Sequence, residues 1–211
     1  MHIRQPIVAV LGHVDSGKTS ILDKIRGTGV QGREAGGITQ HIGASFLPDE
    51  TIQKICGSLY EKLGNTETKI PGLLVIDTPG HEVFTNLRAR GGSAADIAIL
   101  VVDINRGFQP QTNESLKILE SRKVPFVVAL NKVDMISGWQ KSDIPYISQA
   151  IKKQISPVQT TIDEQIYNVV GALSILGYQS EAFYRVQDFK KEISIVPLSA
   201  RSGVGLSLIH I

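Results

Sequence analysis

Five short apolar runs, each ending in a polar or glycine-bearing segment, constrain the fold of this chain most. The runs are IVAVL (7–11), LLVI (73–76), IAILVV (97–102), FVVAL (126–130) and ISIVPL (193–198). The segments that follow them are GHVDSGKT, DTPGH, DINRG, NKVD and SARSG. Strands without polar alternation are buried on both faces, which indicates a parallel sheet covered by helices. Ligands in such folds bind beyond the carboxyl ends of the strands, so we expect the five polar segments to converge.

Helical patterns lie between these runs. Apolar residues share one face in three places: Ile21, Leu22 and Ile25; Phe84 and Leu87; and Leu116 with Leu119 in 112–122. Residues 38–46 differ, because Ile42, Ala44 and Phe46 alternate with polar residues, as in a half-exposed edge strand. We therefore predict an α/β fold with a mostly parallel six-stranded sheet, one antiparallel edge strand and helices on both faces.

Residues 137–191 carry a different pattern, in which no strand is needed and two helices are expected. Ile144, Ile147, Ile151 and Ile155 share one helical face; Ile162, Ile166, Val169, Leu173 and Leu176 share another, closing at Gly177. This predicts a helical insertion before the last strand. We expect a single domain over 1–205, followed by a truncated or non-native tail at 206–211.

Composition excludes several classes of protein. The chain has 211 residues, a net charge of +2 and 42% hydrophobic residues, which is ordinary for a globular domain and too mildly basic to indicate nucleic-acid binding by bulk charge. Its single cysteine, Cys56, is expected to be a small buried residue. No apolar stretch is long enough to span a bilayer, so we expect no membrane contact and a cytoplasmic location.

The first polar segment, GHVDSGKT at 12–19, matches G-x-x-x-x-G-K-[ST] between a strand and an amphipathic helix. In this motif the backbone N–H groups cradle phosphate oxygens, the lysine reaches the β- and γ-phosphates, and the threonine hydroxyl ligates Mg²⁺. A chance match in a chain of this length occurs at a rate on the order of one per cent. The phosphate-binding residues predicted here are Gly12, His13, Val14, Asp15, Ser16, Gly17, Lys18, Thr19 and Ser20.

Two further segments supply candidate metal and phosphate ligands. In DTPGH, Asp77 is placed to hold Mg²⁺ through water, and Gly80 to offer its N–H to the γ-phosphate. In the glycine-rich loop before the edge strand, Thr39 is the best Mg²⁺ ligand, and it would order that loop when a nucleoside triphosphate is bound. Asp15 has two open interpretations: an acid that favours the helix N-terminus, or a ligand for a cation near the phosphates.

The segment NKVD (131–134) selects the base. Asp134 can accept hydrogen bonds from the N1–H and 2-amino groups of guanine, and adenine has neither donor. Asn131 can bond the N7 edge and tie loops together, while the stem of Lys132 can lie on the ring face. The last segment completes the predicted guanine site with Ser199, Ala200, whose N–H can reach O6, and Arg201.

These motifs together resemble those of the translational GTPases, which include elongation factor Tu. The stretches LGHVDSGKTSILDKIRGTGVQGREAGGITQHIGAS and LVIDTPGHEVFTNLRARGGSAADIAILVVDINRGFQPQT are more closely similar to the archaeal and eukaryotic initiation factor 5B branch, related to bacterial initiation factor two. The resemblance implies a Ras-like P-loop GTPase fold and a factor that promotes ribosomal subunit joining.

The resemblance also implies residue roles. His81 would position the attacking water once the ribosome reorients it, Val14 and Ile38 would form an apolar gate, and Asp15 would help hold a monovalent cation such as K⁺ or Na⁺. The expected partners are GTP or GDP, Mg²⁺ and the large ribosomal subunit as activator. Initiator tRNA would be contacted only through further domains, and the domain is expected to be a monomer.

Two other functions remain open from the residues alone. A P-loop phosphotransferase would use the same phosphate loop but leave NKVD without a role. A nucleotide-binding assembly module would lack useful catalysis, so that His81→Ala would not change turnover.

Overall fold

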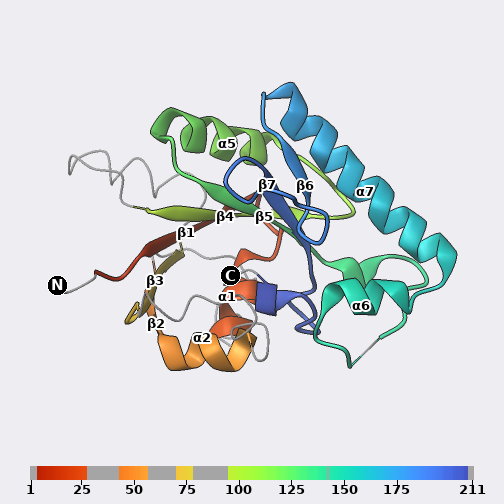
Figure 1. The fold of residues 1–211 in the computed structure, drawn as a ribbon, viewed down its shortest axis with the longest axis horizontal. Coiled ribbons are helices and arrows are strands. Elements are labelled where there is room, and N and C mark those ends of the chain that lie inside the picture. Colours follow the sequence, from red (N-terminus) through yellow and green to blue (C-terminus); the bar gives the residue numbers. More distant parts are fainter. Residues whose placement is uncertain (1–3, 28–42, 57–69, 78–94, 142, 209–211) are drawn as a thin grey trace.

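A computed structural model describes residues 4–27, 43–56, 70–77, 95–141 and 143–208 of the chain (Figure 1). Its strands are β1 (Ile7–Gly12), β2 (Gly43–Pro48), β3 (Gly72–Asp77), β4 (Ile97–Asp103), β5 (Phe126–Asn131), β6 (Ser180–Ala182) and β7 (Ile193–Pro197). Its helices are α1 (Lys18–Arg26), α2 (Asp49–Cys56), α5 (Pro110–Arg122), α6 (Ile147–Lys152) and α7 (Ser156–Ile175), with short 3₁₀ turns η3 (Val133–Met135) and η4 (Leu206–Leu208).

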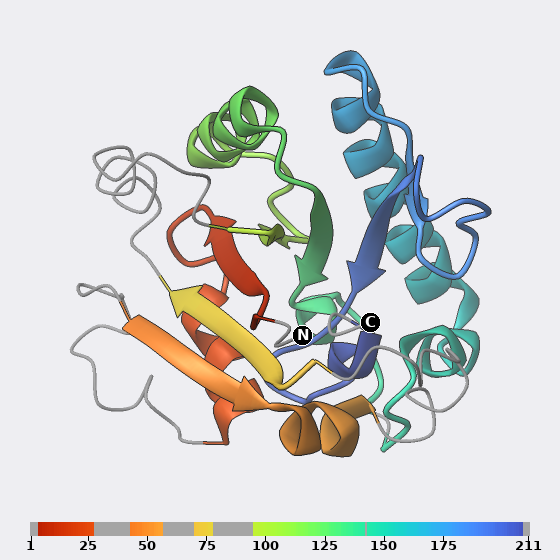
Figure 2. The ribbon, with the colours of Figure 1, turned by 60° about the vertical axis from the view of Figure 1, so that its left-hand side comes forward.

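The strands form one sheet in the order β2-β3-β1-β4-β5-β7-β6. Every neighbouring pair is parallel except β2 and β3, whose arrows run in opposite directions in Figure 2. The central strand β1 buries Ala9, Val10 and Leu11 completely. Its apolar run needs no polar alternation because helices cover both of its faces. The predicted mostly parallel α/β sheet with an antiparallel edge strand is confirmed.

The sheet divides the described core into two layers (Figure 1). Helices α5, α6 and α7 pack on one face through residues such as Leu116, Ile147 and Ile166. Helices α1 and α2 and the turn η4 pack on the other, through residues such as Leu22 and Ile52. The buried faces of α5 and α1 are those that the sequence predicts.

The register brings the carboxyl ends of the strands to one edge. The aligned pairs are Val10 with Asp77, Gly12 with Val101, Asp103 with Asn131, and Leu130 with Pro197. The polar segments that follow β1, β4, β5 and β7 therefore start side by side at this edge of the sheet. The candidate functional site consists of residues from these segments.

The prediction of six strands and a strandless insertion is wrong in one respect. Residues Ser180–Ala182 form a seventh strand, β6, parallel to β7 at the edge of the sheet. A three-residue edge strand needs only backbone hydrogen bonds and one buried side chain, here Ala182, so it has no apolar run to reveal it.

The helices of the insertion also differ from the predicted pattern. The face of Ile144, Ile147, Ile151 and Ile155 is not one helix, because α6 covers only Ile147–Lys152, and Ile155 is the N-cap of α7. Pro157 in the first turn of α7 favours a new helix start there. The second predicted face is correct for Ile162, Ile166, Val169 and Leu173, whereas Leu176 lies past the helix end and is 40% exposed.

The edge strand β2 buries the opposite face from the one its alternation predicts. Leu47 is buried, whereas Phe46 is 47% exposed and Ala44 is exposed. The reason is α2, which follows Pro48 directly and packs Ile52 and Cys56 in the same core layer as Leu47. Cys56 is a small buried residue, as expected. The predicted helix around Phe84 and Leu87 lies outside the described residues.

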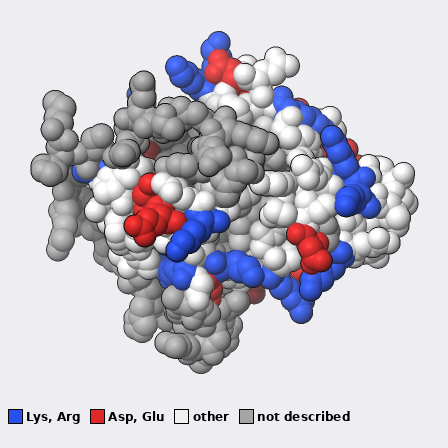
Figure 3. Space-filling view, turned by 60° about the horizontal axis from the view of Figure 1, so that its bottom comes forward, with Lys and Arg blue, Asp and Glu red and all other residues white. Residues whose placement is uncertain are grey.

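The charged side chains on the surface and the polarity of the helices can be compared with the composition. On the face drawn in Figure 3, basic and acidic side chains lie intermixed, in keeping with a net charge of +2. Among the described residues, every helix is too short or too polar to cross a membrane.

Candidate nucleotide-binding site

The loop between β1 and α1 has the backbone of a phosphate cradle. Gly12 and Gly17 have φ of +143° and +95°, values that side chains disfavour. A Cβ on Gly12 would lie 2.2 Å from the carbonyl oxygen of Val101, so β4 approaches too closely for any other residue. Asp15 is also left-handed, at φ +62°, and the Ser16 N–H donates to the His13 carbonyl over 3.2 Å. The resulting loop turns its chain sharply into the N-terminus of α1.

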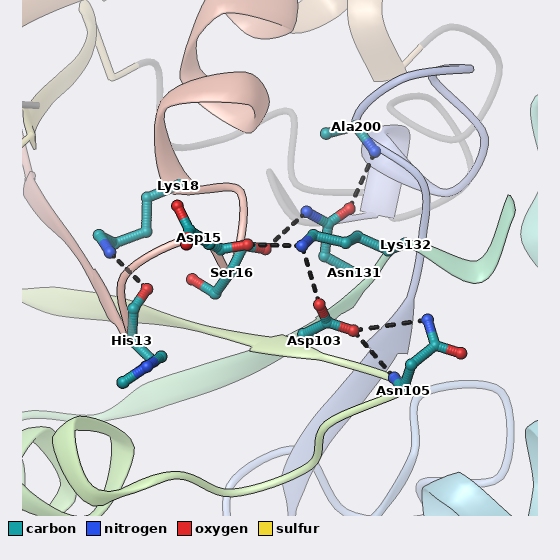
Figure 4. Close-up of polar contacts among 9 residues, drawn as sticks. All are labelled: His13, Asp15, Ser16, Lys18, Asp103, Asn105, Asn131, Lys132 and Ala200. Atoms are coloured by element: carbon teal, nitrogen blue, oxygen red, sulfur yellow. Dashed lines mark hydrogen bonds and ion pairs between the residues drawn. The ribbon is translucent and has the colours of Figure 1, made fainter. Parts of the chain in front are cut away.

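The motif's lysine lies over this loop. The Nζ of Lys18 donates to the carbonyl oxygen of His13 over 2.8 Å (Figure 4). It also donates to the carbonyl oxygen of Gly12 over 3.0 Å. Its ammonium is thus held where the loop would surround an anion. Thr19 and Ser20 follow in the first turn of α1, where the helix N-terminus favours negative charge.

Asn131, at the end of β5, joins two loops that are far apart in sequence. Its Nδ2 donates to the Ser16 carbonyl over 2.9 Å, and its Oδ1 accepts from the Ala200 N–H over 3.0 Å (Figure 4). The side chain is almost completely buried, and a Cβ on Gly17 would lie only 2.3 Å from its Nδ2. The amide therefore holds the phosphate loop and the loop after β7 in a fixed relation.

Lys132 bridges the phosphate loop and the end of β4. Its Nζ donates to the Asp15 carbonyl and pairs with Asp103 Oδ2 at 2.8 Å (Figure 4). Asp103 is 8% exposed and also accepts from the Asn105 N–H over 2.9 Å. Sequence reasoning missed Asp103 as a site residue, although the signal was present: a carboxylate at the carboxyl end of a buried strand, in DINRG.

A cavity of about 740 Å³ opens beside these contacts. It is lined by Gly17, Ser20, Asp23, Lys24, Gly27, Asn131, Lys132, Asp134, Met135, Ala200 and Arg201. This volume suits a nucleotide-sized ligand. The cavity joins the end of the phosphate loop to the two segments predicted to read the base, 131–134 and 199–201.

The structure brings together most of the predicted site residues. Gly12 to Ser20 form the loop and first helical turn, Asn131, Lys132 and Asp134 lie across from them, and Ser199, Ala200 and Arg201 follow β7. Asp77 ends β3 opposite Val10. Ile38, Thr39, Gly80 and His81 lie outside the described residues. Within the described ranges, the acidic, histidine and cysteine side chains do not form a cluster of three or more that could hold a metal ion.

The fold and the loop at 12–20 define a P-loop nucleotide-binding protein. The chain belongs to the elongation factor Tu GTP binding domain family, whose model matches residues 4–210. It is therefore a GTP-binding domain of the translational GTPases, a family that hydrolyses GTP and generally uses Mg²⁺. The predicted resemblance is confirmed.

Relatives of high sequence identity come from archaea. The chain is 56% identical over 205 residues to a probable translation initiation factor IF-2 of Thermococcus onnurineus and to one of Methanopyrus kandleri. In both comparisons, 97% of this chain aligns with 34% of the relative, so the chain spans about a third of their length.

Solved structures give the same picture. GDP-bound aIF5B from Aeropyrum pernix has a TM-score of 0.85 and 52% identity, over 99% of this chain and 35% of that one. The bacterial selenocysteine-specific elongation factor EF-Sec has a TM-score of 0.57 over 97% of this chain and 27% of that one, but its 23% identity supports the fold alone.

Proposed function

We propose that this chain is the GTP-dependent switch of an archaeal-type translation initiation factor that promotes ribosomal subunit joining. The observation that carries the proposal is the 740 Å³ cavity between the phosphate loop, NKVD and the loop after β7, held in shape by Asn131. The GDP-bound structure of aIF5B, at 52% identity, supports the same ligand class for this chain.

In this proposal, the loop from Gly12 to Ser20 binds the β- and γ-phosphates, with Lys18 supplying positive charge. The hydroxyl of Thr19, that of Thr39 and the carboxylate of Asp77, through water, would hold Mg²⁺, which prefers such oxygen ligands. When bound, the metal neutralises charge that develops on the phosphates. Two roles are open for Asp15: an acid that favours the N-terminus of the helix, or a ligand for a monovalent cation.

The base would enter the cavity between Lys132 and the loop after β7. Asp134 would accept from guanine N1–H and the 2-amino group, and the Ala200 N–H would reach O6. Because this N–H already donates to Asn131 Oδ1 in the structure, it would then be shared between the two acceptors. Ser199 and Arg201 complete this side of the pocket.

Hydrolysis would be slow in the chain alone. His81 would orient the attacking water only after the ribosome moves it past the gate formed by Val14 and Ile38; Val14 is 39% exposed at the loop. An unassisted switch GTPase runs at roughly 10⁻⁴ s⁻¹ and gains about 10⁵-fold from its activator, or about 7 kcal/mol of barrier.

The rest of the proposal concerns the location and extent of this domain and the further domains of the whole factor. The chain acts as a cytoplasmic monomer, a G domain over 1–205 with an insertion at about 137–191. Initiator tRNA is bound through further domains. These statements rest on the relatives, which are about three times as long.

The base assignment is tested with Asp134→Asn and the control Asp143→Asn, an exposed aspartate outside the cavity. Loss of the carboxylate should weaken GDP binding about 10- to 100-fold, the value of hydrogen bonds to a charged group, and favour xanthosine diphosphate. Unchanged GDP affinity in Asp134→Asn, or equal displacement of labelled GDP by ATP and GTP, would contradict the assignment.

The switch is tested by GTP turnover of the full-length factor with and without ribosomes, for the parent and for His81→Ala. We expect ribosome stimulation in the parent and its loss in the variant. Rapid turnover by the 211-residue chain alone, or full stimulation of His81→Ala, would overturn this part of the proposal.

A further inference from the structure

The segment from the end of β4 into the first turn of α5, residues 103–112, lies against the phosphate loop. A cavity of only about 10 Å³ separates them, lined by His13 to Ser16 on one side and by Asp103, Gln109 and Thr112 on the other. That space holds about one water molecule. The phosphate loop is therefore supported from this segment by close packing.

One side chain of this segment bonds directly to the loop. The Oε1 of Gln111 accepts the Val14 N–H over 2.9 Å. Gln111 is the second residue of α5, and helical side chains lean toward the N-terminus of their helix, which here points at the loop.

The helix start that carries Gln111 is itself fixed. Pro110 occupies the first turn of α5, and Gln109 and Thr112 form a reciprocal capping box. The carbonyl oxygen of Gln111 accepts a 2.8 Å hydrogen bond from Ser115 Oγ. The amide is thus presented from a rigid position.

The hydrogen bond between Val14 and Gln111 lies next to a strained residue of the loop. Asp15 adopts a left-handed backbone, which costs a non-glycine residue energy. Gln111 holds the peptide N–H just before it, at Val14, and Lys132, paired with Asp103, holds the carbonyl of Asp15 itself. Side chains from outside the loop therefore fix it on both sides of the left-handed residue.

We propose that Gln111 is a positioning residue for nucleotide binding: it holds the Val14 peptide so that the loop keeps its left-handed turn before a phosphate arrives. Asp103 does the same at the Asp15 carbonyl, acting through Lys132. This inference rests on the phosphate-binding role proposed for residues 12–20. Sequence analysis assigns Gln111 no role, although it lies at the end of the second stretch that carries the family resemblance.

The test compares Gln111→Leu with Asn113→Leu, an exposed amide two residues further along α5, in the 211-residue chain. The first readout is the hydrogen-exchange rate of the Val14 amide, which NMR measures on the nucleotide-free chain. We expect Gln111→Leu to remove the protection of this amide and Asn113→Leu to leave it. Gln111→Glu keeps an acceptor oxygen at the same reach and should retain the protection.

The second readout is GDP affinity. Gln111→Leu should weaken GDP binding about threefold to tenfold, the range that one hydrogen bond provides, with the affinity of Asn113→Leu unchanged. Protection of Val14 that survives Gln111→Leu, or is lost in Gln111→Glu, would overturn the inference. So would a loss of thermal stability in Gln111→Leu with unchanged GDP affinity, because that marks a merely structural role. If the parent chain itself fails to bind GDP, the proposed function fails, and the Val14 exchange data still decide the contact.

Discussion

Asn131 offers the sharpest test of how the site is assembled. Its buried amide makes two hydrogen bonds, to the Ser16 carbonyl and from the Ala200 N–H. In Asn131→Ala both partners lose their hydrogen bond. A buried group left unsatisfied costs about 1–3 kcal/mol.

The lower end of this range applies here, because Asn131 and Ala200 both line the 740 Å³ cavity, from which water can reach the freed groups. Each of the two freed groups then costs about 1–1.5 kcal/mol. We therefore expect Asn131→Ala to lose about 2–3 kcal/mol of unfolding free energy in the absence of nucleotide. For a domain of this size, that is a fall in Tm of about 5–10 °C.

Urea unfolding of the nucleotide-free chain, followed by circular dichroism, measures this loss. The matched control is Asn168→Ala on α7, an exposed asparagine whose Nδ2 donates to Gln165 Oε1 over 3.4 Å. The control should change stability by no more than about 0.5 kcal/mol. Equal unfolding midpoints for the two variants would refute the view that Asn131 holds the two loops together.

Two further predictions follow from the glycine loop and from Cys56. Gly12→Ala should lose more than about 3 kcal/mol in the same unfolding assay, because its Cβ would meet the Val101 carbonyl at 2.2 Å. Gly27→Ala, also at positive φ but with open space around it, should cost only about 1–2 kcal/mol; equal losses would contradict the clash. Burial, with a smaller effect of Asp49, raises the pKa of Cys56 to about 11, so the stability that the neutral thiol confers is present below pH 9 and lost as the pH rises through 11. The stability difference between the parent and Cys56→Ala should shrink over that window, and a constant difference would contradict the burial effect.

The strands around the site could be predicted because their signal is local and strong. Val10 and Leu130 are buried on a sheet covered on both faces, so a continuous apolar run is enough to identify each strand. The phosphate loop could be predicted because its glycines serve backbone positions that a side chain cannot occupy, as the approach of Val101 to Gly12 shows.

The features that escaped prediction depend on partners distant in sequence. Ser180 belongs to a strand only because β7 lies beside it, and Leu47 is buried only because α2 folds back on its face of the sheet. Gln111 and Asp103 resemble ordinary polar residues of a helix start and a strand end. The contact of Gln111 with the loop requires that α5 packs beside the loop. Asp103 acts on the loop only through Lys132, which follows β5.

The strand order has a consequence for how the chain folds during synthesis. β1, the first of the described strands along the chain, lies between β3 and β4, and both of its neighbours are formed by residues from 72 onward. When synthesis has reached residue 70, the chain therefore carries the apolar run of Ala9 to Leu11 without the strands that bury it. Long-range parallel pairing of this kind is slow and leaves apolar segments exposed while synthesis proceeds. Among the described strands, β1, whose carboxyl end begins the nucleotide site, is thus the one whose two neighbours follow it latest in the chain. We expect its apolar run to stay exposed until those strands are made.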